Sequence, residues 1–168
     1  MNEIVLGGGC FWCTEAAFKE LEGVKEAISG YAGGHTENPN YREVCNGDTG
    51  HAEVVKVEFD EEAISLEKVL EFFFRIHDPT TEDREGPDVG SQYRSIILYR
   101  DEEQRETVEE FIEKKRSEYE DEVVTEVEKL ESFYRAEEKH QDYFERNPED
   151  AYCVMHARPK KEKARSFN

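Results

Sequence analysis

Two cysteines near the start of the chain are the residues best placed to do chemistry. Cys10 and Cys13 form a Cys-x-x-Cys pair that follows an apolar run at 4–6 and three glycines, and helix-forming residues follow Cys13. This order predicts a strand, a tight turn and a helix, with Cys10 at the helix start. Unpaired backbone N–H groups and the positive end of the helix dipole favour an anion there. We therefore expect the pKa of the Cys10 thiol to be lowered and Cys10 to act as a nucleophile.

The Cys-x-x-Cys pair also permits other interpretations. A zinc site would need two further ligands, and the remaining cysteines, Cys45 and Cys153, do not form a second close pair. A thioredoxin-like dithiol carrier fits the strand-to-helix context, but none of the five prolines stands where a strand would place one opposite the pair. Four inert, buried cysteines are a further alternative, although three glycines before a helix pack poorly. The single catalytic thiol would have Phe11 and Trp12, the only tryptophan, as walls of its pocket.

A carboxylate faces inward on a predicted strand. In the alternating segment 51–59 the apolar residues Val55, Val57 and Phe59 fall on one face, and Glu53 has the same parity. Burial beside apolar groups raises the pKa of a carboxyl group toward neutrality. Glu53 would then be able to donate a proton as a general acid, while a salt-bridged strand residue is the plainer alternative.

Strands and helices alternate along the rest of the chain. We expect strands at 4–6, 24–31, 51–59, 94–99 and 123–127, helices at 11–21, 66–76 and 101–119, and a last short helix over about 133–144 that ends before Pro148. The long loops at 33–50 and 77–90 are unusual in a compact domain and point to function. The pattern predicts a single domain, 1–168, of the α/β (α+β) class. We expect a two-layer sandwich with a central mixed sheet, helices packed on it, long loops and an irregular C-terminal tail at about 148–168.

The charge balance limits the partners of the protein. The net charge is −19, which argues against nucleic acid because phosphate binding needs a basic surface. The last eleven residues, 158–168, contain five basic residues and one acidic residue. We expect this basic tail to be solvated or folded back on the chain rather than to bind an acidic partner.

The ends of the chain and its hydropathy bear on localisation. The N-terminus leads directly into a short strand, without a signal peptide, and no apolar stretch approaches the roughly 20 residues that cross a membrane. We therefore expect a cytoplasmic protein, without membrane contact and as a monomer. In that compartment the cysteines are catalytic or metal-binding rather than paired in structural disulfides.

Seven motifs together resemble the peptide methionine sulfoxide reductase A family. They occur in the family's order, between about residues 5 and 145, and seven motifs in register are highly specific. The motifs are Gly8-Gly9-Cys10-Phe11-Trp12, Ser29-Gly30-Tyr31-Ala32-Gly33-Gly34, Asn38-Pro39-Asn40-Tyr41, Gly50-His51-Ala52-Glu53, His77-Asp78-Pro79-Thr80, Asp88-Val89-Gly90-Ser91-Gln92-Tyr93-Arg94-Ser95 and Phe133-Tyr134-Arg135-Ala136-Glu137 with His140-Gln141.

The resemblance implies a thiol-dependent reduction of methionine-S-sulfoxide, free or in oxidised proteins. Thioredoxin or another dithiol would be the final reductant, and no metal or organic cofactor would take part. Cys10 would attack the sulfur and Glu53 would supply a proton to the oxygen. Tyr41 and Tyr93 would donate hydrogen bonds to the same oxygen.

The resemblance also implies a substrate pocket. Phe11 and Trp12 would enclose the substrate methyl group through shape and sulfur–aromatic contact. Asp88 would line the pocket. His51 and His140 match motif positions as well, and we expect both to be structural.

Three cysteines are candidates for the second thiol of the reaction. Attack by Cys10 leaves a sulfenic acid, which a second thiol converts to a disulfide. Family members often carry this resolving cysteine in a flexible C-terminal segment, which favours Cys153, although its neighbours are not rich in glycine. Cys13 stands where many members have glycine, and we expect rigid helical geometry to disfavour its bond to Cys10. We rank Cys153 first, Cys13 second and Cys45 third.

Overall fold

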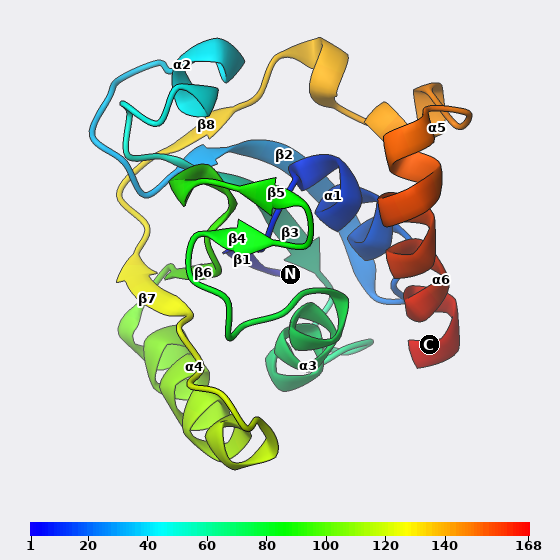
Figure 1. Ribbon diagram of the computed structural model, residues 1–168. Helices are drawn as coiled ribbons and strands as arrows, with labels where there is room; N and C mark the ends of the chain where they lie inside the picture. The colour runs from blue at the N-terminus through cyan, green and yellow to red at the C-terminus, as the bar shows by residue number, and fades with distance from the viewer.

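A six-stranded mixed sheet forms the centre of the computed structural model, which describes residues 1–168 (Figure 1). The strands lie in the order β7-β6-β1-β3-β2-β8, and all neighbours are antiparallel except β6 and β7. The bounds are β1 Asn2–Gly7, β2 Val24–Ala32, β3 Ala52–Phe59, β6 Ile96–Tyr99, β7 Glu126–Lys129 and β8 Phe133–Arg135. Two further strands, β4 Arg84–Glu85 and β5 Asp88–Val89, form a separate small ribbon.

Helices connect and cover the strands. They are α1 Phe11–Lys19, α2 Tyr41–Cys45, α3 Leu66–Ile76, α4 Glu102–Lys115, α5 Tyr143–Arg146 and α6 Arg158–Phe167. Single 3-10 turns occupy Ser91–Tyr93, Arg116–Glu118 and Glu138–His140, and a π-helical turn occupies Cys153–Ala157. The C-terminal helix α6 lies beside α1 (Figure 1). None of the helices has the length and apolar character that a membrane span requires.

The main core lies between one face of the sheet and the helices. The inward side chains of β1 and β3, such as Leu6 and Val57, pack in one cluster with Phe18 of α1 and Phe73 of α3. The opposite face of the sheet carries a smaller apolar cluster that includes Val54. The alternation predicted for β3 is therefore confirmed, and so is the α/β (α+β) class with a mixed sheet and helices packed on it.

The last predicted helix is wrong over its first part. Phe133–Arg135 is the edge strand β8, which pairs with β2 so that Tyr134 lies opposite Tyr31. Gly30 leaves room for the Phe133 ring, since a Cβ at position 30 would lie 2.4 Å from that ring. Pairing with a distant strand therefore decides the conformation of this aromatic segment. Only a 3-10 turn and the four-residue α5 follow it before Pro148.

The predicted irregular tail is also wrong, because most of it is helical. Pro159 stands in the first turn of α6, where the missing N–H is not needed, and Ala164 packs into the core. Of the two expected states of the basic tail, solvated or folded back, the structure shows the folded-back one. Lys160 pairs with Glu85 at 2.9 Å, and Arg165 pairs with Glu20 at 3.2 Å.

Candidate active site

The glycine turn places Cys10 between β1 and α1. Cys10 is the N-cap residue of α1, with φ −65° and ψ 128°, so its backbone is extended and the helix begins at the next residue. Gly9 has a φ of +96°, and a Cβ at Gly8 would lie 2.8 Å from the His77 ring, so the turn requires glycine at both positions. The predicted strand, turn and helix, with Cys10 at the helix start, are confirmed.

The prediction of a lowered pKa for Cys10 is wrong. The side chain is buried in an apolar cluster, and this burial raises the pKa of the Cys10 thiol well above its usual value. The neighbouring Cys13 and the carboxyl of Glu53 raise it further. The Trp12 backbone N–H lowers it, but one hydrogen bond does not offset the loss of water.

Glu53 lies deep beside the glycine turn. It is 1% exposed, and Oε1 accepts a hydrogen bond of 3.1 Å from the Phe11 backbone N–H. Oε2 is buried without a hydrogen-bond partner. Burial raises the pKa of Glu53 to about 8, against the effect of that hydrogen bond, and the negative charge of Asp88 adds to the rise. The carboxyl group is therefore mostly protonated at neutral pH and has one oxygen free for a ligand.

The phenols of Tyr41 and Tyr93 lie in the electrostatic field of the Glu53 carboxyl group. Tyr41 is the first residue of α2, which a capping box at Asn40 stabilises. Tyr93 is the last residue of a 3-10 turn, and its carbonyl oxygen accepts a hydrogen bond of 3.2 Å from the Gly9 N–H of the glycine turn. Burial raises the pKa of both phenols, and the Glu53 charge raises both further. The structure thus places both predicted tyrosines close enough to Glu53 for its charge to act on them, and both are neutral phenols.

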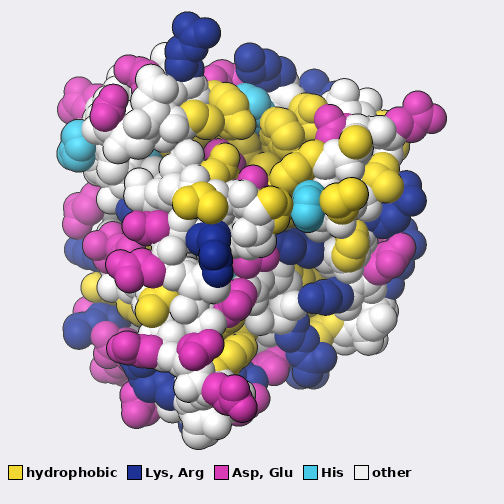
Figure 2. Space-filling view, viewed as in Figure 1, with side chains coloured by type: hydrophobic (Ala, Val, Ile, Leu, Met, Phe, Trp, Pro, Cys, Tyr) yellow, Lys and Arg dark blue, Asp and Glu magenta, His cyan; other side chains and the backbone are white.

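Aromatic rings form the wall of the site. The Trp12 indole stacks on Tyr143 with ring centroids 3.7 Å apart and planes 8° apart, and its Nε1–H donates a 3.1 Å hydrogen bond to Nδ1 of His140. His140 also lies against Tyr41 at 4.4 Å and against Phe11 at 5.5 Å. Hydrophobic side chains gather on the same face of the molecule, between the regions of α2 and α5 (Figure 2). We call this set, Phe11, Trp12, Tyr41, His140 and Tyr143, the aromatic cage.

The C-terminal segment closes one side of the site. The Tyr152 hydroxyl donates a hydrogen bond to Asp88 in β5 and lies 3.9 Å from the Cys13 thiol. Its ring meets Trp12 edge-on with centroids 6.1 Å apart. The predicted pocket residue Asp88 is thus linked to the site through Tyr152.

Three of the four cysteines lie together. Cys10, Cys13 and Cys153 belong to one buried apolar cluster, in which Cys153 is fully buried. A hydrogen bond from Cys10, and then the charge of Lys160, lower the pKa of Cys13 against the effect of its burial. Cys45 lies outside this cluster, at the end of α2 beside the Tyr41 hydroxyl.

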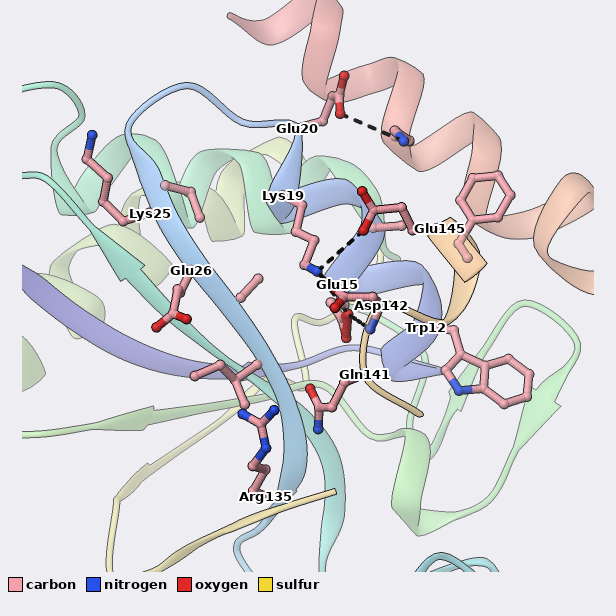
Figure 3. Close-up of a pocket in the computed structure, with 16 residues that line it drawn as sticks. Trp12, Glu15, Lys19, Glu20, Lys25, Glu26, Arg135, Gln141, Asp142 and Glu145 are labelled. Carbon is pink, nitrogen blue, oxygen red and sulfur yellow. Dashed lines mark hydrogen bonds and ion pairs between the residues drawn. The ribbon is translucent and has the colours of Figure 1, made fainter. Parts of the chain in front are cut away.

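The two motif histidines differ in their surroundings. His51 is fully bonded, because Nδ1 accepts from Gly34 N–H at 3.0 Å and Nε2 lies 2.7 Å from the Thr36 carbonyl oxygen, which confirms a structural role. His140 belongs to the aromatic cage, and its Nε2 is buried without a partner. A separate cavity of about 410 Å³ borders Trp12, but charged side chains line most of it and no thiol reaches it (Figure 3).

Two aromatic residues of the site, Tyr143 and Tyr152, are not among the residues expected from the sequence. Each stands close to one that is, His140 and Cys153 respectively. An aromatic residue next to a candidate thiol is the signal that would have identified Tyr152. The stacking of Tyr143 on Trp12 had no local signal, because 131 residues separate the two rings.

Comparisons with known proteins agree on one family. A family model described as peptide methionine sulfoxide reductase matches residues 2–168. The chain is 64% identical over 162 residues to peptide methionine sulfoxide reductase MsrA of Natronomonas pharaonis, a match that covers 95% of this chain and 91% of that protein. Reduced Mxr1 of Saccharomyces cerevisiae has a TM-score of 0.86 and 36% identity, covering 92% of this chain and 90% of that one. Mxr1 in complex with Trx2 has a TM-score of 0.62 and 25% identity over 84% of each chain.

Proposed function

The chain belongs to the peptide methionine sulfoxide reductase family, whose oxidoreductases reduce methionine sulfoxide, and on this premise we propose which residues carry the reaction. Cys10 is the nucleophile that attacks the sulfoxide sulfur. Its position directly before Phe11 supports this role, because the Phe11 N–H binds the Glu53 carboxyl group and so brings the thiol close to an acid. Its burial supports it as well, because a desolvated sulfur reacts readily once its proton has been removed.

Glu53 is the general acid, and one observation carries this proposal. Its carboxyl group is buried, has a pKa of about 8 and keeps Oε2 free of any partner. A carboxylic acid that is protonated at neutral pH and has an unpaired oxygen is equipped to bind and protonate a sulfoxide oxygen. Tyr41 and Tyr93 add hydrogen bonds to the same oxygen, since both are neutral phenols beside Glu53.

The first half-reaction balances with these groups alone. The Cys10 sulfur forms a bond to the substrate sulfur while Glu53 gives its proton to the oxygen, and the proton of the Cys10 thiol restores the acid. The S–O bond of the substrate and the new S–S bond then break, and the hydroxyl group passes from the substrate sulfur to the Cys10 sulfur. The sulfoxide is reduced by two electrons to the thioether, and Cys10 is oxidised to a sulfenic acid. No metal or organic cofactor is needed, because the thiol supplies both electrons.

The aromatic cage holds the substrate side chain. We assign Phe11 and Trp12 to the methyl group, and Asp88, through Tyr152, to the outer edge of the pocket. A cage with the acid on one side and rings on another is chiral, and we propose that it accepts the S epimer. Free methionine sulfoxide and residues in oxidised proteins are both substrates in this proposal.

Cys13 and Cys153 complete the cycle. The pKa of the Cys13 thiol is lowered by a hydrogen bond from the Cys10 thiol. Cys10 lies before the first helical residue and has an extended backbone, so rigid helical geometry does not disfavour a disulfide between the two cysteines. Cys13 therefore condenses with the sulfenic acid, and water leaves. Cys153 then attacks the Cys13 sulfur and displaces the Cys10 thiolate, which leaves a Cys13–Cys153 disulfide. The effect of the Cys13 charge on the Cys153 thiol supports their proximity.

A dithiol protein returns the enzyme to its reduced form. The yeast relative in complex with Trx2 supports thioredoxin in this role. We place the enzyme in the cytoplasm as a monomer, where thioredoxin keeps cysteines reduced.

Two experiments test the proposal. Cys10→Ser should abolish sulfoxide reduction, and retained turnover would end the assignment of the nucleophile. Disulfides should also be mapped by mass spectrometry after one turnover without reductant. We expect Cys13–Cys153 in the parent enzyme and Cys10–Cys13 in Cys153→Ser, whereas a Cys10–Cys153 bond in the parent enzyme would contradict the relay through Cys13.

A further inference from the structure

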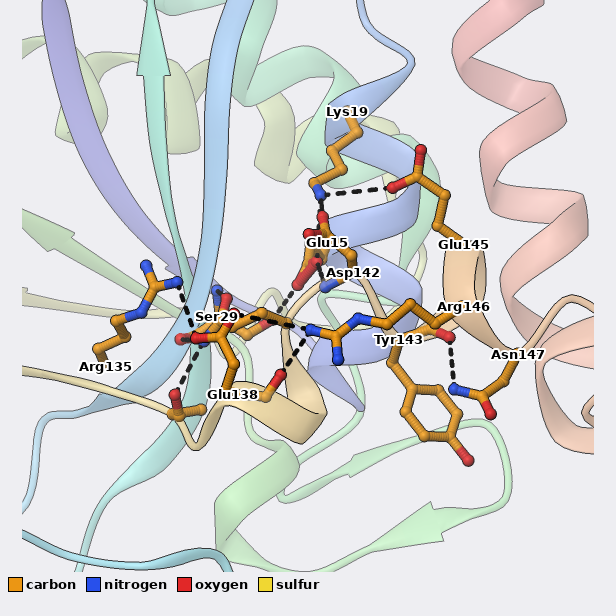
Figure 4. A network of polar contacts seen from close by, with 12 residues as sticks. Glu15, Lys19, Ser29, Arg135, Glu138, Asp142, Tyr143, Glu145, Arg146 and Asn147 are labelled. Carbon is orange, nitrogen blue, oxygen red and sulfur yellow. Dashed lines mark hydrogen bonds and ion pairs between the residues drawn. The ribbon is translucent and has the colours of Figure 1, made fainter.

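One buried carboxylate has no part in the reaction described above. Glu15 lies on α1, one turn after Trp12, and is 2% exposed. It accepts a hydrogen bond of 2.6 Å from the Ser29 hydroxyl and one of 2.5 Å from the Asp142 backbone N–H (Figure 4). Lys19 lies 3.6 Å from the same carboxylate. Burying a charge in this way is costly, so the network calls for an explanation beyond packing.

The residue that Glu15 holds has an unusual backbone. Asp142 has φ 55° and ψ 33°, a left-handed conformation that few residues other than glycine adopt. Such a conformation persists only where the surroundings fix it. The hydrogen bond from the Asp142 N–H to Glu15 fixes Asp142 itself. The preceding residue, Gln141, is fixed by hydrogen bonds of 3.1 Å and 2.9 Å between its side chain and the Ser29 backbone.

The fixed segment carries both groups that hold Trp12. His140 accepts the indole N–H, and Tyr143 stacks on the indole face. Glu15 and Trp12 belong to the same helix, so the contacts form a closed ring from Trp12 through segment 140–143 to Glu15 and back along α1. A shift of this segment would therefore move both supports of the indole together.

We propose that Glu15 is a positioning residue, which fixes segment 140–143 and thereby orients Trp12 for the substrate. It contacts neither the substrate nor the reacting atoms. The inference rests on the proposed role of Trp12 as a wall of the substrate cage. Glu15 thus acts on substrate affinity, whereas the chemistry at Cys10 and Glu53 does not depend on it.

Two substitutions at position 15 separate the hydrogen bond from the charge. Glu15→Leu removes the acceptor and leaves the Asp142 N–H buried without a partner. Glu15→Gln keeps an acceptor for that N–H, while its amide donates to the Ser29 hydroxyl, which is able to accept. We expect the Leu variant to raise KM for a methionine sulfoxide peptide roughly 10-fold, because a hydrogen bond to a charged group is worth about that factor. We expect the Gln variant to stay close to the parent, and kcat to change little in either.

Fluorescence gives a second readout, independent of substrate. Trp12 is the only tryptophan, so the emission spectrum reports on its surroundings alone. We expect the Leu variant to change emission intensity and wavelength, because the stacking on Tyr143 and the bond to His140 are disturbed. Glu145→Leu is the matched control, since Glu145 lies 3.9 Å from Lys19 at the surface and does not bond to Asp142 N–H. Its KM and spectrum should match the parent.

Ser29→Ala tests the same inference if the Glu15→Leu variant does not fold. It leaves Glu15 in place and removes one donor, so a smaller change of KM and emission in the same direction is expected. A folded Leu or Ala variant with the parent's KM and spectrum would overturn the inference, and so would an effect confined to the melting temperature. Trp12→Phe tests the premise separately. An unchanged KM in that variant would contradict the cage role of Trp12, while the emission spectra would still decide whether Glu15 positions the indole.

Discussion

Replacing Glu53 by glutamine should stabilise the folded protein while it removes the reductase activity. The buried carboxyl group has a pKa of about 8 in the folded protein, compared with an ordinary value of 4.5. Above pH 4.5 the unfolded chain therefore loses this proton while the folded protein keeps it. Keeping the proton costs stability as the pH rises from about 4.5 to about 8, and the loss levels off above that range. Glutamine is neutral at every pH and does not carry this cost.

The size of the effect follows from the pKa difference. Each unit corresponds to about 1.4 kcal/mol, and at pH 7 the pH lies 2.5 units above 4.5, so the variant should gain about 3 kcal/mol. The gain should be near zero at pH 4.5. The amide oxygen of glutamine keeps the bond from Phe11 N–H, so no other interaction need be lost. Turnover should fall by about 10²- to 10⁴-fold, because an amide binds the sulfoxide oxygen but does not supply a proton.

Urea unfolding at several pH values between 5 and 8 measures this effect. Unfolding followed by circular dichroism gives the free energy of unfolding for parent and variant. The quantity to compare is the difference in the free energy of unfolding between parent and variant, since the net charge of −19 affects the stability of both alike. A difference that does not depend on pH, or a variant less stable than the parent at pH 7, would refute the raised pKa. Glu137→Gln is the control of opposite sign, because hydrogen bonds from Tyr31 and Tyr41 lower the pKa of that carboxyl despite its partial burial.

Four other measurements test separate parts of the structure. In the parent enzyme kcat/KM should fall about tenfold per unit above pH 8, as Glu53 loses its proton, and a flat profile to pH 10 would contradict its role as the acid. Tyr93→Phe should lower kcat/KM roughly 10-fold through the loss of one hydrogen bond to the sulfoxide oxygen, with the folded structure checked by circular dichroism. Lys160→Gln removes the ion pair with Glu85, so Cys153 should react several-fold faster with an alkylating agent, and an unchanged rate would show that this pair does not hold the tail. Raising NaCl from 0.1 to 1 M should raise the melting temperature, because the net charge of −19 opposes folding and salt screens it.

Local patterns in the sequence were sufficient for the parts of the site that depend on neighbouring residues. The glycine turn identified the start of α1 and thus the place of Cys10. The alternation of β3 identified Glu53 as an inward carboxylate, since side chains of a strand alternate between faces. Both features are set within fewer than ten residues.

Features that depend on distant parts of the chain were not predictable in the same way. The pKa of Cys10 is set by burial under the C-terminal segment and by Glu53, so the position at a helix start was a misleading guide. The helical tail is stabilised by ion pairs with Glu20 and Glu85, which come from other elements. Strand β8 forms because β2 offers it an edge, despite a local pattern that favours a helix.

The π-helical turn at Cys153–Ala157 bears on how a reductant reaches the Cys13–Cys153 disulfide of the proposed cycle. A π-turn holds one more residue than a regular helical turn, and such turns are rare and frequently lie at functional sites. If this turn relaxes to an ordinary α-turn, the residues before it rotate by about 100° relative to α6. Cys153 and Tyr152 would then swing away from the buried cluster while α6 keeps its ion pairs with the rest of the protein. A local change of one turn would thus present the disulfide to a reductant, without release of the whole tail.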